Sequence, residues 1–445
     1  MKALQTSPEC NSSYLATVVW IDKFEPHPNA DRLQIAQIFG YRIITSKDAP
    51  PGFYCYFPIE CAIAESFLAY GNSFRDATKN ADKLTVGYFN DTGRVKAIKL
   101  RGEKSEGYIM PIQALVDYCK DVLGQTLVIK DLKNGGEDFD LLFGQMLVRK
   151  YVPPFTVSAP RQGKPGGKKS RAESILVENQ FRLHESTAQL KRNMHRLDPD
   201  HEVVITEKYH GTSFVVGNVL RKRRLNWKDK LAKKLGVAVV DTEYGLVYSS
   251  RSVVKNAFED KDPGGYYKVD VWKVAADQIF PLLAKGLTAY GEIVGYTPTG
   301  GFIQKGYDYG CPHGKMKCII YRMTYTNLDG SVFELSHRQM EDYCKRRGLE
   351  TPHVHYAGKL KDMYPEHVGH EHWHSIVLQK MEEDYLEKDC RYCISSKGIP
   401  AEGVVLRLEN PNEWNVFKLK SFRFLAKESS DLDKGEVDME TSETE

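Results

Sequence analysis

The sequence predicts an α+β protein with two domains, a small β-barrel followed by a larger domain of mixed strands and helices. The first 150 residues consist of short β-branched and aromatic runs, separated by Gly, Pro, Asn and Asp. Residues 152–174 then hold four prolines, three glycines and five basic residues, a composition typical of a flexible linker. Beyond them, mixed strands and helices continue to Ala426. The predicted boundaries are a barrel at 1–150, a basic linker at 151–181, a second domain at 182–426 and a disordered acidic tail at 427–445.

The strands of the first domain are short and evenly spaced, which fits a Greek-key barrel of the OB type. They are expected at 15–21, 33–38, 41–44, 54–58, 95–100 and 107–111. Two polar stretches, residues 27–33 and 100–108, resemble the OB domains of tRNA-binding proteins and of some RNA ligases. The first is equally consistent with a turn in which Asn29 and Asp31 make local backbone bonds.

Composition excludes several classes of protein. Of 445 residues, 41% are hydrophobic and 27% charged, enough for ordinary globular cores. No run of eighteen apolar residues is present, and the N-terminal stretch has no apolar signal segment. Nine cysteines are too few and too scattered for a disulfide scaffold. We therefore expect an intracellular protein, cytoplasmic or nuclear, without a signal peptide or transmembrane segment.

The net charge of +3 hides an asymmetry. The last nineteen residues hold eight acids and two lysines, a net of −6, so the remainder carries +3 − (−6) = +9. A basic body favours a polyanionic partner, with nucleic acid first, over a merely solvated surface. Residues 221–234 hold eight basic residues, one acid and Trp227. They are either a solvated insertion or an arm that follows phosphates and stacks on a base.

A helix is predicted after the linker, with Ser186 as its N-cap. Leu190, Met194 and Leu197 follow at i, i+4 and i+7, so they share one apolar face.

The strongest chemical signal lies in residues 203–216, which read as a strand, a tight turn and a second strand. Lys208 ends the first strand, three residues before Gly211. A lysine becomes a nucleophile when neighbouring cations or desolvation lower its pKa. Gly211 would let the chain turn sharply beside a bound phosphate. Taken alone, Lys-x-x-Gly is a common pattern.

Further elements follow in a fixed order. Glu292 is predicted at a strand end flanked by glycines, and Glu402 at the start of an apolar strand. Lys418 and Lys420 are two residues apart in a strand, so their side chains lie on the same face. Between the first and last elements, Arg251 follows a short polar run and an apolar strand ends in an aromatic residue, Tyr321.

This ordered set resembles the nucleotidyltransferase motifs of covalent ligases and capping enzymes, from about residue 180 to 426. His210, before Gly211, resembles RNA ligases more than DNA ligases, which usually have Asp there. Only 25 residues follow Lys420, too few for a C-terminal barrel. The N-terminal barrel resembles the RNA ligases of the Deinococcus and Naegleria type. That likeness implies an adenylyltransferase domain of antiparallel sheets with flanking helices.

The resemblance also implies roles for the four charged residues. Lys208 would attack the α-phosphate of ATP and hold AMP as a phosphoramidate. Glu402 would bind a hydrated Mg²⁺ or Mn²⁺. Lys418 and Lys420 would grip the α-phosphate and stabilise charge in the transition state.

It implies roles for five further positions around the nucleotide. Glu292 would bind the ribose or assist the metal, and Arg251 would contact the ribose or the 5′-phosphate. Tyr321 would stack on adenine, unless it is only a core aromatic residue. His210 would face the leaving pyrophosphate, and the backbone of Glu207 would read the adenine. Ser213 departs from the Asn common in related ligases, which leaves that contact open.

A structural Zn²⁺ site is a further hypothesis. Cys390 and Cys393 form one Cys-x-x-Cys pair, and Cys311, His313 and Cys318 could add ligands. The alternative is a set of buried free thiols and surface histidines.

The function that fits best is ATP-dependent ligation of RNA 3′-hydroxyl and 5′-phosphate ends, at nicks or breaks in RNA repair. The protein would act as a monomer, with RNA as its partner. A GTP-dependent capping guanylyltransferase and a non-catalytic tRNA- or RNA-binding protein are the alternatives.

Overall fold

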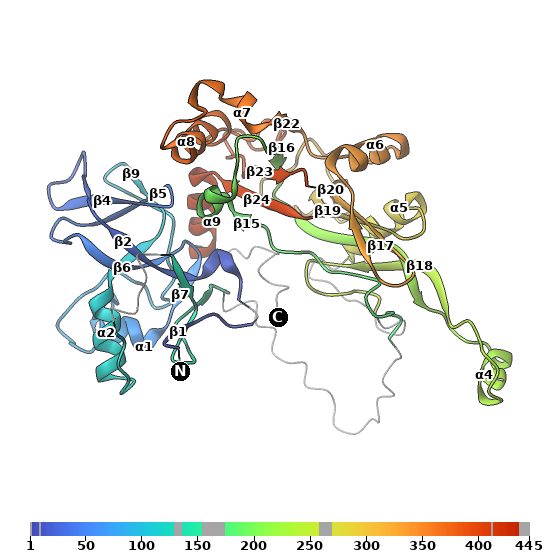
Figure 1. The fold of residues 1–445 in the computed structure, drawn as a ribbon, viewed down its shortest axis with the longest axis horizontal. Coiled ribbons are helices and arrows are strands. Elements are labelled where there is room, and N and C mark those ends of the chain that lie inside the picture. The colour runs from blue at the N-terminus through green and yellow to red at the C-terminus, as the bar shows by residue number, and fades with distance from the viewer. Residues whose placement is uncertain are drawn as a thin grey trace.

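The computed structural model describes residues 2–8, 10–128, 136–153, 174–257, 269–410 and 413–435. Figure 1 shows three bodies in a row: the N-terminal elements, a sheet that contains β16, β23 and β24, and a sheet that contains β17, β19 and β20. In the described residues, no helix is both long and apolar enough to span a bilayer.

The N-terminal part is built around an antiparallel sheet of order β10-β6-β2-β11. These strands are β10 (Tyr108–Pro111), β6 (Gly52–Phe57), β2 (Ala16–Ile21) and β11 (Glu137–Phe139). A second sheet of order β3-β4-β5 contains β3 (Glu25–Pro26), β4 (Leu33–Ile38) and β5 (Tyr41–Ser46). The smaller elements are β1 (Leu4–Gln5), β7 (Cys61–Ile63), β8 (Ile98–Leu100), β9 (Glu103–Ser105), β12 (Leu141–Leu142), β13 (Gln145–Met146), β14 (Val148–Lys150), α1 (Glu65–Tyr70) and α2 (Ile112–Asp121).

Strand β2 is buried on both faces, which is why its apolar run is nearly continuous. Val18 packs into a core shared with α1 and α2, whereas Val19 packs against β4 and β5. The predicted hairpin at 100–108 is present as β8 and β9, and its turn residues Arg101 and Gly102 have positive φ angles of 50° and 95°. The described strands fall into several separate sheets, so the predicted closed OB barrel is not confirmed.

The second part contains two five-stranded sheets. The first, of order β15-β24-β23-β16-β22, contains β15 (Ala188–Gln189), β24 (Asn415–Lys420), β23 (Gly403–Leu408), β16 (Glu202–Lys208) and β22 (Val354–Lys359). The second, of order β18-β17-β19-β20-β21, contains β18 (Thr242–Ser249), β17 (Thr212–Lys222), β19 (Leu287–Gly295), β20 (Met316–Thr326) and β21 (Val332–Glu334). All pairings are antiparallel except that of β15 with β24.

This part of the chain also contains helices, most of which pack against the two sheets. They are α3 (Leu190–Asn193), α4 (Trp227–Lys234), α5 (Val271–Ile279), α6 (His337–Arg347), α7 (Leu360–Met363), α8 (Trp373–Tyr385) and α9 (Phe422–Asp433). Short 3₁₀ turns lie at Ser12–Tyr14, Ala77–Lys79, Met194–Arg196, Phe280–Leu282 and Pro365–His367. Apolar residues of α5 and α6 form one core with β17, β19 and β20, and those of α7 and α8 form another with β16, β23 and β24. This agrees with the predicted α+β class.

The helix predicted after the linker is shorter than expected. Gln189, not Ser186, is its N-cap, because Ala188 and Gln189 pair with β24 as a strand. Helix α3 spans only Leu190–Asn193 and continues as a 3₁₀ turn. The predicted apolar residues are nevertheless buried in one core, as the i, i+4, i+7 pattern required.

Two predicted boundaries are wrong. The acidic tail does not begin at 427, because α9 continues to Asp433. Ser421 caps this helix, accepting a 3.4 Å hydrogen bond from the N–H of Phe424. The linker is also shorter than predicted, because Lys222 donates its backbone N–H to Ile175 (2.8 Å) and Ile175 is buried. Residues 154–173 and 436–445 lie outside the described residues.

Buried polar contacts join the N-terminal part to the rest of the chain. Lys191 on α3 forms ion pairs with Glu106 (3.1 Å) and with Glu382 (2.6 Å), and the side chains of Lys191 and Glu106 are only 4% and 2% exposed. Burial lowers the pKa of Lys191, but the two carboxylates outweigh it and raise the pKa overall. Because an unpaired buried charge is strongly unfavourable, these contacts fix how the two parts meet.

Candidate active site

Three neighbouring strands bring the predicted lysines together. Lys208 ends β16 and is paired with Gly403 on β23, which in turn is paired with Lys420 on β24. Glu402 directly precedes Gly403, so this register brings the carboxylate between the two lysines. Gly403 has φ +138°, and a Cβ atom there would lie 2.1 Å from the carbonyl oxygen of Leu419, so only glycine fits.

Glu402 binds both ammonium groups through a single oxygen. Its Oε1 lies 2.8 Å from Lys208 Nζ and 3.2 Å from Lys420 Nζ. The Glu402 side chain is 2% exposed, whereas the two lysines remain 23% and 19% exposed. Burial raises the pKa of Glu402, but the charges of Lys208, Lys420 and His210 outweigh burial and lower this pKa to about 2. The carboxylate is therefore ionised at any physiological pH.

The second oxygen of Glu402 fits a divalent cation. Oε2 is buried and accepts no hydrogen bond from the residues that the structure describes. A hard carboxylate oxygen with a vacant lone pair is a typical ligand for Mg²⁺ or Mn²⁺ and for their bound waters.

Glu292 lies within β19 rather than at a strand end, which corrects the prediction. Its Oε1 accepts the N–H of Gly211 (3.1 Å) and its Oε2 accepts the hydroxyl of Ser213 (3.2 Å). The hydroxyl of Ser213 therefore contacts Glu292 in this structure. A Cβ on Gly211 would lie 2.2 Å from the carbonyl oxygen of Ile293, so glycine is required for the close approach of β17 to β19.

The turn that carries the chain from one sheet to the other is held by aromatic residues. His210 donates its backbone N–H to the hydroxyl of Tyr309 (2.7 Å). Its ring makes edge contacts with Tyr307 and Phe424, each with centroids 4.9 Å apart. These contacts restrict the backbone on both sides of His210, and hence the position of Lys208.

The remaining predicted residues border the same cavity, which has a volume of about 190 Å³. Lys418, Arg251 and Tyr321 line it, as do Lys208, His210, Glu292, Glu402 and Lys420. Arg251 donates to the Ser186 hydroxyl (3.4 Å). Tyr321 lies edge-on to His184, with centroids 5.9 Å apart.

Glu207 also lines the cavity, but its side chain and its backbone N–H already have partners in the protein. Its Oε2 lies 2.9 Å from His355 Nε2, and its backbone N–H donates to the carbonyl oxygen of His353 (2.9 Å). Any reading of adenine by this backbone must therefore use a group other than the N–H.

Sequence reasoning missed one acid on α9 and one wall of the cavity. Glu428 lines the cavity, and its Oε2 lies 3.7 Å from Lys420 Nζ. The helical spacing of Phe422, Leu425 and Leu432 was the signal that could have placed Glu428 on an ordered element. Tyr14 of the N-terminal part also lines the cavity, where burial raises its pKa and Lys420 opposes that shift. No sequence motif predicted that Tyr14 would line the cavity.

The cysteines do not gather around a metal. Cys390 and Cys393 place their sulfurs 2.7 Å apart, but in the described part of the chain no three His, Cys, Asp or Glu side chains form a group suited to a metal ion. Because structural zinc needs four ligands, the zinc hypothesis is not supported.

Comparisons with known proteins bear on the family and the fold. A family model described as RNA ligase matches residues 201–422, which include every predicted site residue. The fold is similar to solved structures of a Naegleria gruberi RNA ligase at 13–14% identity. One variant with AMP and Mn gives a TM-score of 0.53 over 93% of this chain and 98% of that chain. A second, with ATP and Mn, gives 0.53 over 95% and 100%, and a third, also with ATP and Mn, gives 0.55 over 93% and 99%. The search of curated protein sequences gave no match.

Proposed function

The chain belongs to the RNA ligase family through residues 201–422, and we propose that it is an ATP-dependent enzyme that joins RNA 3′-hydroxyl and 5′-phosphate ends. The observation that carries this proposal is the placement of Lys208 Nζ and Lys420 Nζ within 2.8 and 3.2 Å of one buried carboxylate oxygen. Such convergence from three strands gives a nucleophile, a second cation and an anionic metal ligand in one cavity.

In the first step Lys208 Nζ attacks the α-phosphorus of ATP. A P–N bond forms, the bond to the β-phosphate oxygen breaks, and pyrophosphate leaves. Lys208, whose side chain is 23% exposed, must lose one proton to solvent before it attacks, and the adjacent carboxylate of Glu402 is placed to orient the lysine side chain.

Positive charge around the α-phosphate comes from β24. Lys418 and Lys420 lie on the same face of that strand, and both line the cavity. A divalent cation held at Glu402 would neutralise phosphate charge when bound. The fixed lysines would stabilise the charge that develops on the phosphate oxygens.

The same cavity serves the two later steps. An oxygen of the RNA 5′-phosphate attacks the phosphorus of lysyl-AMP and releases Lys208, which leaves an RNA 5′-adenylate. The 3′-hydroxyl then attacks the 5′-phosphorus, joins the strands and releases AMP. Each step is an in-line substitution at phosphorus, so positioning and positive charge are required throughout.

Incubation with α-labelled ATP or GTP and Mg²⁺, followed by a denaturing gel, tests the proposal. An AMP adduct on the wild-type chain is the expected result. A GMP adduct would instead identify a capping guanylyltransferase, and no adduct with either nucleotide would identify a non-catalytic RNA-binding protein.

A second assay defines the substrate. The substrates are nicked duplexes with ribose or deoxyribose on each side of the nick. If the enzyme acts in RNA repair, it should seal them only when the strand that ends in the 3′-hydroxyl carries ribose at the nick. Equal sealing of all-deoxyribose nicks would contradict the assignment to RNA.

A further inference from the structure

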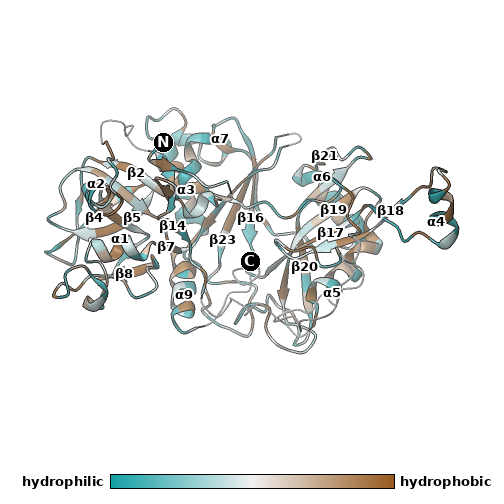
Figure 2. Ribbon diagram, turned by 90° about the horizontal axis from the view of Figure 1, so that it is seen from below, coloured by the Kyte–Doolittle hydropathy of each residue, from teal (hydrophilic) through white to brown (hydrophobic). Residues whose placement is uncertain are grey.

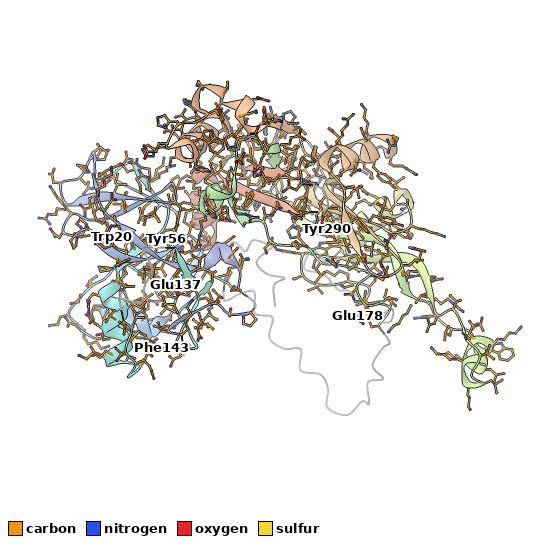
Figure 3. All side chains as sticks on the ribbon, in the orientation of Figure 1. Trp20, Tyr56, Glu137, Phe143, Glu178 and Tyr290 are labelled. Carbon is orange, nitrogen blue, oxygen red and sulfur yellow. The ribbon has the colours of Figure 1, made fainter. Side chains whose placement is uncertain are left out.

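The hairpin that joins β17 to β18 carries α4 at the end of the molecule farthest from the N-terminal part (Figures 1 and 2). The name arm is used here for residues 221–243. Helix α4 has no buried residue. Figure 3 shows side chains projecting from this tip, which stands apart from the rest of the ribbon.

The arm is an ordered structure. Asn226 and Asp229 form a reciprocal capping box at the start of α4. Arg223 Nη1 lies 2.7 Å from Asp229 Oδ2, and Lys233 Nζ lies 3.1 Å from Asp241 Oδ2. These pairs tie the helix to the two strands below it.

The ion pairs divide α4 into two faces. Asp229 and Lys233 are four residues apart and therefore share the face that meets the hairpin. Trp227 and Leu231 are also four apart, and at 100° per residue they lie on the opposite face. Their exposed fractions of 70% and 48% confirm that this face meets solvent.

Three lysines surround the exposed Trp227. At 100° per residue, Lys230 and Lys234 lie on one side of the Trp227 face and Lys228 lies on the other. Of the residues that the structure describes, none forms an ion pair with these three ammonium groups. Every acid of the arm is already paired, Glu243 with Arg221 at 3.3 Å. The arm holds eight basic residues and three acids, a net charge of 8 − 3 = +5.

We propose that this face of α4 binds an unpaired stretch of the RNA substrate, away from the nucleotide cavity. Phosphates would contact Lys228, Lys230 and Lys234, and a base would stack on Trp227. The inference rests on the proposed function, since RNA is the polyanion that the cavity handles. Lys228 Nζ lies over the Trp227 ring, 5.8 Å from its centroid, and none of the three lysines forms an ion pair with a described residue. An exposed aromatic ring among such cations is a pattern of single-strand binding. Bases inside a duplex cannot reach such a ring, which is why the arm fits an unpaired strand.

Two variants separate the two kinds of contact. The triple variant K228A/K230A/K234A removes three phosphate partners, and Trp227→Ala removes the stacking surface. The matched control is K345A/R346A/R347A, which removes three charges from the exposed end of α6. Trp227→Phe keeps an aromatic ring and serves as the rescue variant.

The affinity of each protein for a single-stranded oligoribonucleotide is measured by fluorescence anisotropy at several salt concentrations. The triple variant should weaken binding by roughly 10-fold and reduce the slope of log K against log salt by about 2, since each phosphate contact contributes ~0.7. Trp227→Ala should weaken binding by roughly 10-fold without changing the slope, and Trp227→Phe should restore most of the affinity. The α6 control should leave both quantities near wild type.

Self-adenylylation is measured on the same samples. A wild-type chain that forms no adduct would contradict the proposed function. Normal adduct formation together with unchanged RNA affinity in both arm variants would overturn the arm proposal alone, and would leave the Trp227 face for an acidic protein partner. Equal loss in the α6 control would also overturn it, because the effect would then be one of net charge.

Discussion

At the scale of single residues, Glu402 organises the site. One of its oxygens holds two ammonium groups that would otherwise repel each other. The side chain is 2% exposed, so these attractions are weakly screened by solvent and salt. The other oxygen has no hydrogen-bond donor among the described residues. In the proposed mechanism, this one residue would position the nucleophile with one oxygen and offer the other to a metal ion.

Lys208→Ala is expected to abolish the covalent nucleotide adduct and to leave the fold intact, because Lys420 still pairs with Glu402. The measurement is the labelled adduct on a denaturing gel, with circular dichroism as the check on folding. Lys208→Arg is the matched control, because it keeps a charge beside Glu402 but remains protonated and cannot attack. An adduct formed by either variant at a rate near wild type would show that another residue is the nucleophile.

Glu402 also predicts a dependence of stability on pH. Its pKa is lowered from 4.5 to about 2, so its contribution is present above pH ~4.5 and is lost as pH falls toward 2. The shift corresponds to about 3 kcal/mol. Wild type should be more stable than Glu402→Gln in urea unfolding at pH 7, and the gap should narrow by about 2 kcal/mol at pH 3.

A gap that stayed constant over that range would mean that the carboxylate is not stabilised by the lysines. A reference variant for the same titration is Glu350→Gln, because this acid is exposed and its ion pair with Lys317 is long, at 3.8 Å.

At the scale of elements, α9 connects the cavity to the N-terminal part. One end of the helix brings Phe424 against His210. Farther along, Ser429 donates its hydroxyl to Glu60 (2.9 Å), and its carbonyl oxygen accepts from Arg94 Nη2 (2.8 Å). Burial raises the pKa of Glu60, and Arg94 opposes that shift. Glu428 is thus held at the cavity by contacts on both sides of it.

Arg94→Ala should destabilise the protein by about 3 kcal/mol, because its side chain is 2% exposed and its loss removes the larger of the two positive charges, Arg94 and Lys420, that oppose the burial of Glu60. It should also slow self-adenylylation several-fold, since α9 carries Glu428 and Phe424. Unfolding in denaturant and a single-turnover adenylylation assay provide the two readouts.

Lys96→Ala is the matched control. Lys96 pairs with the same Asp433 as Arg94 does, but Asp433 is 48% exposed, so the loss should be below about 1 kcal/mol. Equal losses in both variants would refute the role given to the buried network.

At the scale of the whole molecule, the cavity is shared between the two parts of the chain. Tyr14, Glu60 and Lys150 line it from the N-terminal side, although the motifs lie between Lys208 and Lys420. The buried ion pair between Lys191 and Glu106 joins the two parts. We therefore expect both nucleotide chemistry and end joining to depend on how the two parts meet.

Deletion of residues 1–150 should reduce both activities. The motifs alone predict that sealing is weakened far more than self-adenylylation, because every motif lies beyond that segment. The contacts predict that lysine adenylylation also falls by at least about 10-fold, since Lys191 loses Glu106 and the cavity loses a wall. Joining of a pre-adenylylated 5′ end should fall further, because two strand ends must be held in line.

Glu106→Gln in the full chain tests the single contact with Lys191, whereas the deletion removes the whole N-terminal part. It should lower adenylylation less than the deletion does, because Lys191 retains Glu382 at 2.6 Å. A deleted chain that adenylylates itself at the full rate would mean that the N-terminal wall plays no part in nucleotide chemistry.

The sequence by itself, with its resemblance to the ligase motifs, determined which residues are candidates for the site. Lys208, Glu402, Lys418 and Lys420 could be selected because strand periodicity and glycine placement are local properties of a chain. The positions of most strands followed from the same local patterns. Whether the N-terminal strands close into a barrel could not be predicted from local patterns, because closure of a sheet depends on pairing between distant strands.

Only the tertiary structure decided how the site is assembled. The pairing of Lys208 with Glu402 depends on the register of β16 against β23, across almost two hundred residues of sequence. The acids of residues 427–433 predict a solvated tail, whereas these residues belong to α9 and make buried contacts with Arg94 and Glu60. Helical spacing could have placed Glu428 on a helix but not at the cavity, and no local pattern predicts the Tyr14 wall, because both depend on long-range packing.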